Sequence, residues 1–206
     1  MAKVIAQEDG KTMLAAHITE WCEPGTVYEK IKFGPIAAPG APTKNQVIVG
    51  IKAASINVDD CPLLQDTACG GMGYHTRKPT VAQPVVGGQD FAGVVLECGP
   101  DCKKLKVGDR VCGFINLLTP NTAEGTWAER TVIPESDVCL IGDDSISFVD
   151  AAAMAMGAFV NFHAIKSATR PLVAGGFRCL VIGASGALGS VSNFCFLDLL
   201  NLSGSL

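Results

Sequence analysis

The stretch Arg178-Cys179-Leu180-Val181-Ile182-Gly183-Ala184-Ser185-Gly186-Ala187-Leu188-Gly189 joins a short apolar run to a loop with three evenly spaced glycines. Short apolar runs are typical of parallel strands that are covered on both faces. Glycine lets the backbone turn sharply, lets a phosphate approach the main-chain amides and lets the next helix pack close to the strand. The stretch therefore predicts the first strand, the phosphate-binding loop and the helix start of a dinucleotide-binding domain. An ordinary strand-to-helix turn is the alternative interpretation.

The chain after this loop is short. Only residues 190–206 follow, and they could form some helix but no second strand. A dinucleotide-binding domain needs that strand, and on it an acidic or basic residue that selects the ribose or its 2′-phosphate. We therefore expect an incomplete domain that leaves Leu180, Val181 and Ile182 in an apolar patch.

The chain before the loop has the character of a β-rich domain. Val47, Val49, Ile51 and Ala53 recur at every second position, which places them on one face of a strand. Further strands are expected at 27–33, 91–97, 110–115 and 126–132. Several short strands separated by turns predict a closed or nearly closed barrel.

A helix is expected after this barrel. Ser147 and Asp150 match a capping box, in which Ser147 accepts from the amide three residues on and Asp150 reaches back to the cap amide. The Ala- and Met-rich run that follows predicts a helix to about Lys166, with Gly157 tolerated inside it. These patterns divide the chain into a barrel domain, 1–145, and a connecting helix with the start of a nucleotide-binding domain, 146–206.

Composition narrows the class of protein. The formal net charge of −4 gives no electrostatic reason to expect nucleic acid or an anionic membrane as a partner. No run reaches the roughly 18 apolar residues that a membrane helix needs, and the N-terminus turns acidic too early for a signal peptide. The nine cysteines include no CxxC pair. We therefore expect reduced thiols and a cytoplasmic location.

Five ordered segments resemble a known family. They are 54–60 (ASINVDD), 84–95 (PVVGGQDFAGVV), 105–111 (LKVGDRV), 125–129 (GTWAE) and the glycine loop 183–189. Together they resemble the zinc-free quinone oxidoreductases and enoyl reductases of the medium-chain dehydrogenase/reductase family. The resemblance implies a mainly β fold with an α/β part: a GroES-like β-barrel followed by the start of a Rossmann domain. It ends near Ser190.

The resemblance also bears on metals. Zinc-dependent relatives carry a Gly-His-Glu where this chain has Gly88-Gln89-Asp90, and a Cys in the segment that matches 54–60, where this chain has none before Cys61. Catalytic zinc needs three good protein ligands, and a glutamine amide is a poor one. We therefore expect no zinc.

The resemblance implies site residues and a cofactor. Asn57 matches the active-site Asn near the nicotinamide, and Asp60 matches the Asp that follows it. A turn-capping role for Asn57 and a helix-start cap for Asp60 are the alternatives. Residues 183–189 would bind the cofactor, expected to be NADPH with NADH as the alternative. The chain departs from the pattern at Pro62 and Val160, and Tyr74, His75 or Arg77 are candidate donors to the substrate.

Three interpretations of function stay open. The first is a reductase that transfers hydride to a small-molecule quinone, enone or enoyl acceptor, and that is inactive as these 206 residues alone. The second is a non-catalytic GroES-like interaction module, and the third is a truncated gene or splice product. A homodimer, or a partner chain that covers the incomplete domain, is expected in the first two.

Overall fold

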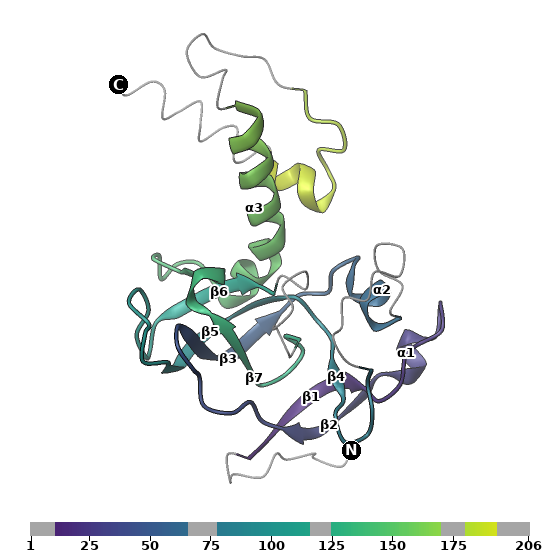
Figure 1. The fold of residues 1–206 in the computed structure, drawn as a ribbon. Helices are drawn as coiled ribbons and strands as arrows, with labels where there is room; N and C mark the ends of the chain where they lie inside the picture. The colour runs from purple at the N-terminus through teal and green to yellow at the C-terminus, as the bar shows by residue number, and fades with distance from the viewer. Residues whose placement is uncertain (1–10, 66–77, 116–124, 170–179, 193–206) are drawn as a thin grey trace. The chain divides into compact units, whose positions relative to one another are not determined.

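The computed structural model describes residues 11–65, 78–115, 125–169 and 180–192 (Figure 1). The chain falls into two compact units, Met1–Ala153 and Met154–Leu206, and the division lies inside helix α3 (Phe148–Thr169). Each unit is treated by itself below. The boundary after residue 145 stays a proposal.

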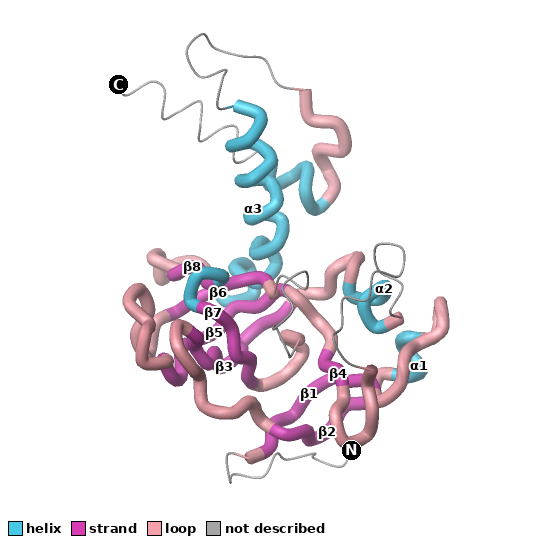
Figure 2. Tube along the Cα trace, viewed as in Figure 1, coloured by secondary structure: helices cyan, strands magenta, loops and turns pink. Residues whose placement is uncertain are grey.

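The larger sheet of the first unit has five antiparallel strands in the order β7-β3-β5-β6-β8 (Figure 2). Their bounds are β3 Gln46–Ala54, β5 Asp90–Cys98, β6 Arg110–Phe114, β7 Arg130–Pro134 and β8 Val138–Leu140. The strands expected at 47–53, 91–97 and 110–115 are thereby confirmed. In β3, Val47 and Val49 are fully buried, as the alternation predicted.

The smaller sheet has the order β2-β1-β4, with β1 Thr12–Ile18, β2 Lys32–Ala37 and β4 Val85–Val86. The two sheets are joined because Ala15 in β1 forms an antiparallel bridge with Ala128, just before β7. Backbone hydrogen bonds on either side of this bridge run from the Ala16 amide to the Trp127 carbonyl and from the Glu129 amide to the Leu14 carbonyl. The predicted mainly β, barrel-like fold is confirmed.

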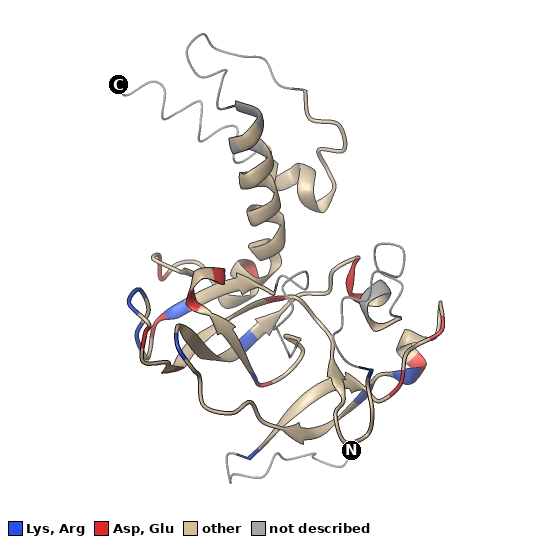
Figure 3. Cartoon of the chain, in the orientation of Figure 1, with Lys and Arg blue, Asp and Glu red and all other residues tan. Residues whose placement is uncertain are grey.

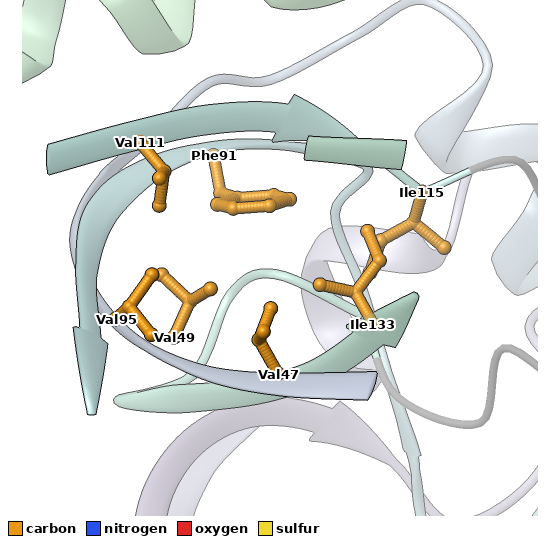
Figure 4. Packing of buried hydrophobic residues seen from close by; sticks show 7 residues of the cluster. All are labelled: Val47, Val49, Phe91, Val95, Val111, Ile115 and Ile133. Carbon is orange, nitrogen blue, oxygen red and sulfur yellow. The ribbon is translucent and has the colours of Figure 1, made fainter. Parts of the chain in front are cut away.

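The core of the first unit lies inside the five-stranded sheet. Phe91 is fully buried and packs with Val47, Val49, Val95, Val111, Ile115 and Ile133 (Figure 4). A second cluster surrounds Ile18 and Leu64 and includes both tryptophans, Trp21 and Trp127, as partly buried members. These clusters fix the ends of β3 and β5, where the candidate site lies.

Three strand predictions need correction. Residues 27–33 divide into a short helix, α1 (Val27–Lys30), and the start of β2, because Gly25 takes a positive φ of 83° and turns the chain before Thr26. The strand expected at 126–132 begins only at Arg130, since residues 126–129 cross to β1. Of the strand expected at 178–182, residues 178 and 179 lie outside the described residues. Residues 180–182 form no strand, and Leu180 and Ile182 are exposed, because no described strand pairs with them.

The helix expected after the barrel is confirmed as α3. The Asp150 amide donates to the Ser147 hydroxyl at 3.1 Å, as predicted for a cap. The Asp150 carboxylate accepts from the same hydroxyl instead of from the cap amide, because Asp is one methylene shorter than the Glu of a full capping box. Arg110 on β6 donates to the Asp143 and Ile146 carbonyls and lies over the Phe148 ring, which fixes the chain entering α3.

The surface of the first unit carries both signs of charge in its loops (Figure 3). Lys103, Lys104 and Lys106 are exposed in the turn between β5 and β6. Within the described ranges, no helix is long and apolar enough to span a membrane.

Candidate active site

The loop that leaves β3 carries Asn57. β3 ends at Ala54 and α2 (Asp60–Leu64) begins six residues later. The Asp60 amide donates to the Asn57 carbonyl at 3.2 Å, and the Asn57 amide donates to the Asp60 carboxylate at 2.6 Å. These reciprocal bonds close residues 57–60 into a turn and bring the two predicted site residues together.

Asp90, the first residue of β5, holds the side chains of this loop. Its Oδ2 accepts from the Ser55 hydroxyl at 2.9 Å and from the Asn57 side-chain amide at 3.2 Å. Asp90 is only 3% exposed, whereas Asn57 is partly exposed. Asn57 and Ser55, which is also partly exposed, are therefore the members of this group that a ligand can reach.

Asp60 lies beneath the loop and is 1% exposed. Its Oδ1 accepts from the Gln89 side-chain amide at 3.3 Å. Burial raises the pKa of Asp60 from 3.8 to about 6, although the hydrogen bonds from Asn57 and Gln89 lower it and the nearby Asp90 carboxylate raises it further. Its depth allows Asp60 to position the loop but keeps it from touching a substrate.

Trp127 supports the loop from the side of the smaller sheet. Its indole N–H donates to the Ser55 carbonyl at 2.9 Å. Gly88 takes a positive φ of 88°, and a Cβ there would lie 2.4 Å from the Trp127 ring. The Gly87-Gly88 pair before Gln89 and Asp90 is thus needed for the ring to pack against the backbone.

The glycine loop belongs to the second unit. Gly183 takes a positive φ of 80°, its carbonyl accepts from the Gly186 amide at 3.0 Å, and residues 187–192 are helical. A Cβ on Gly189 would lie 2.0 Å from the Gly183 oxygen, so the helix can pack here only with glycine. A Cβ on Gly186 would meet only an ordinary contact at 3.4 Å. Two of the three glycines are therefore required by the turn itself, and the middle one is not.

The second unit also ties this helix to α3. The side-chain amide of Asn161 donates to the carbonyls of Gly157, at 2.7 Å, and Leu188, at 2.8 Å, while its oxygen accepts from the Ser192 hydroxyl. Asn161 is buried, so these bonds hold the loop-bearing helix to α3.

The structure says less about the other residues that the sequence singled out. Tyr74, His75 and Arg77 lie outside the described residues. Val160 lies partly exposed in α3. Among the described residues, no group of three or more His, Cys, Asp or Glu side chains could hold a metal ion.

The sequence patterns missed how Ser55, Gln89, Asp90 and Trp127 contribute to the site. The segments around 54–60, 84–95 and 125–129 each carried a resemblance, but nothing in one segment shows which atoms it offers to another. A signal was present in Gly87-Gly88, since paired glycines beside a strand indicate close approach of another group.

The chain is similar to a known domain family and to several known proteins. Residues 43–143 match the family described as alcohol dehydrogenase GroES-like domain. The chain is 30% identical over 178 residues to trans-enoyl reductase RAP2 of Pyricularia oryzae, covering 80% of this chain and 44% of that protein. It is 29% identical over 153 residues to human NAD(P)H oxidoreductase RTN4IP1, mitochondrial, covering 71% and 37%.

A solved structure has a similar fold. The quinone oxidoreductase of Coxiella burnetii superposes with a TM-score of 0.69 at 22% identity, covering 88% of this chain and 52% of that one. The chain thus spans about half of this solved chain and less than half of the length of each of the two relatives.

Proposed function

We propose that this chain belongs to the medium-chain dehydrogenases/reductases, as its GroES-like segment and its relatives support, and that it contributes the acceptor-side domain of an NAD(P)H-dependent, zinc-free oxidoreductase. The observation that carries the proposal is the partly exposed Asn57, held from below by Asp60 and Asp90 in a loop of the GroES-like domain. A quinone, enone or enoyl compound is the proposed acceptor.

Asn57 and the glycine loop have different roles in this proposal. When bound, the reduced nicotinamide supplies the hydride, and the protein supplies orientation and hydrogen bonds. Asn57 would touch the nicotinamide or the acceptor, and Asp60 would position it through the Asn57 backbone amide. The amides of residues 183–189 would hold the pyrophosphate.

The glycine loop fits such a group. Gly183 and Gly189 are needed by the turn, but Gly186 meets no atom that forbids a side chain. A glycine without a steric reason inside the protein is suited to let a phosphate approach its amide closely. NADPH is the proposed cofactor, with NADH as the alternative.

Zinc does not fit the corresponding position. The Gln89 amide nitrogen donates to Asp60 and cannot bind a metal, because its lone pair is delocalised into the carbonyl group. Only the Gln89 carbonyl oxygen remains, and it is a poor ligand for zinc. Asp60 and Asp90 are both engaged by donors within the loop. The proposed reaction therefore relies on hydrogen bonds rather than on a Lewis acid to polarise the acceptor.

The test is an NMR titration with NADPH of the ¹⁵N-labelled 206-residue chain, held at about 20 µM so that it stays below the concentration at which its exposed apolar residues should associate. We expect millimolar NADPH to shift the amides of residues 183–189 and the side-chain amide of Asn57, with weak affinity because one loop gives few contacts. Gly186→Ala should reduce the shifts, and Gly142→Ala, which adds a Cβ in open space, should not. A fully substituted quinone, which spares the cysteines, should shift Asn57.

The outcomes separate two functions. Shifts at neither Asn57 nor the loop would reject the oxidoreductase proposal and favour a non-catalytic interaction module. That second candidate is supported by the exposed Leu180 and Ile182, which would suit a partner surface.

A further inference from the structure

We propose that Asp90 is a positioning residue that fixes the orientation of the Asn57 side-chain amide toward its ligand. This inference rests on the proposed function, because it assigns Asp90 a role at the same site. The sequence patterns named Asp90 only within Gly88-Gln89-Asp90, in the comparison with zinc-dependent relatives, and gave its side chain no role.

The geometry begins with a rigid carboxylate. Asp90 pairs with Phe114 at the start of β5, and the preceding Gln89 carbonyl accepts from the Ile115 amide at 2.9 Å. Asp90 is 3% exposed, and its Oδ2 accepts from both Ser55 and Asn57. The acceptor therefore sits on the sheet, while the two donors come from the loop that follows β3.

The chemistry of the two ends of an amide makes this contact directional. A carboxylate only accepts hydrogen bonds, so it must face the NH₂ end of Asn57 and not the carbonyl end. The Asp59 amide approaches the Asn57 Oδ1 at 3.4 Å, which agrees with that orientation. Asp90 thus decides which end of the Asn57 amide points away from the sheet.

Asp60 and Asp90 act on different parts of Asn57. Asp60 accepts from the backbone amide at 2.6 Å and holds the turn, whereas Asp90 accepts from the side chain at 3.2 Å. An asparagine at position 90 would have both a donor and an acceptor end. It would let the Asn57 amide rotate by half a turn without losing its partner.

The experiment compares Asp90→Asn with the wild-type 206-residue chain in the NADPH titration. The NH₂ resonances of Asn57 report orientation, and the amides of 183–189 in the same spectrum report cofactor binding. In Asp90→Asn, we expect the NADPH-induced shift of the Asn57 NH₂ to fall at least about threefold as the amide loses its single orientation, while the loop shifts remain. Asp101→Asn makes the same change at an exposed carboxyl outside the site and should leave the Asn57 response unchanged.

Each outcome bears on one of the two proposals. An undiminished Asn57 response in Asp90→Asn, with the loop responding, would overturn the role of Asp90 alone. A wild-type chain in which neither Asn57 nor the loop responds would reject the proposed function and the positioning role with it. If Asp90→Asn does not fold, Asp90→Ser replaces it. The wild-type chain must also show slowed solvent exchange of the Asn57 NH₂, and rapid exchange there would contradict the inference.

Discussion

Two buried carboxyl groups hold Asn57 from below, and they impose different constraints on it. Asp90 directs the side chain and Asp60 directs the backbone. Because both carboxyl groups are almost fully buried, water cannot take the place of a donor that moves away from either of them. Two buried residues, which a ligand would not touch, thus determine the geometry of the exposed face of the loop.

Asp60 should make stability depend on pH in the sense opposite to most carboxyl groups. Its folded pKa of about 6 lies above its ordinary value of 3.8, so the folded chain binds the proton more tightly than the unfolded chain. The free energy of unfolding should therefore fall as pH rises from about 4 to 6, by roughly 3 kcal/mol. Asp60→Asn should remove that share. Urea denaturation between pH 3.5 and 7.5 measures it.

The matched control for this prediction is Asp59→Asn, which changes the exposed neighbouring carboxyl. Its pH profile should follow that of the wild type. If the difference between wild type and Asp60→Asn does not change with pH, burial does not perturb Asp60 as described.

At the scale of elements, the glycine loop and its helix depend on two glycines in different ways. Gly189→Ala places a Cβ 2.0 Å from the Gly183 oxygen, so the helical turn at 187–192 must move. Gly186→Ala meets only an ordinary contact. We expect ¹³C secondary shifts of residues 187–192 to lose helical character in Gly189→Ala and to keep it in Gly186→Ala. Equal shifts in the two variants would contradict the steric argument.

The turn between β5 and β6 is clamped by Glu135, in the 3-10 helix η2 (Glu135–Asp137). Its carboxylate accepts from the amides of Lys103 and Lys104, and these bonds lower the pKa of Glu135, the Lys104 amide most strongly. The clamp is therefore complete above pH 4.5 and is lost as pH falls through the lowered pKa. Glu135→Gln should speed amide exchange at 103 and 104 about tenfold. Ser136→Ala is the control.

The sequence predicted elements best where one side-chain period decides the structure. The alternation at Val47 and Val49 identified β3, and the cap at Ser147 located the start of α3. The prediction from sequence failed at 27–33, where a turn at Gly25 overrides an alternating pattern. It also failed at 126–129, where pairing with β1 determines the path of the chain. Asn57 and Asp60 followed from resemblance, but their contacts with Gln89 and Asp90 join positions about thirty residues apart, and local patterns carry no information on such pairs.

At the scale of the whole molecule, one aromatic side chain fills the centre of the five-stranded sheet. Phe91 is fully buried among valine and isoleucine side chains, whereas Phe33 in β2 is 68% exposed. Phe91→Ala should lower the free energy of unfolding by about 3–5 kcal/mol, and Phe33→Ala by less than about 0.5 kcal/mol. Chemical denaturation followed by circular dichroism measures both. Similar losses in the two variants would mean that Phe91 is not the centre of the core.

The exposed apolar residues of the second unit should govern self-association. Leu180 and Ile182 are 83% and 89% exposed, and Phe159 and Phe162 on α3 are also exposed. We expect light scattering to show association of the chain at roughly 50 µM. The double variant Leu180→Asp with Ile182→Asp should reduce it. Tyr28→Asp with Val81→Asp changes equally exposed residues of the first unit and should not. A monodisperse wild-type monomer would refute this prediction.

The packing of Trp127 gives the protein an optical probe of its own. The indole N–H is bonded to the Ser55 carbonyl, two residues from Asn57, and the chain has only one other tryptophan, Trp21. Emission from an indole responds to changes in its hydrogen bond and surroundings. With Trp21→Phe, the remaining fluorescence would follow the loop alone, so that the arrival of an acceptor could be timed in solution without any label.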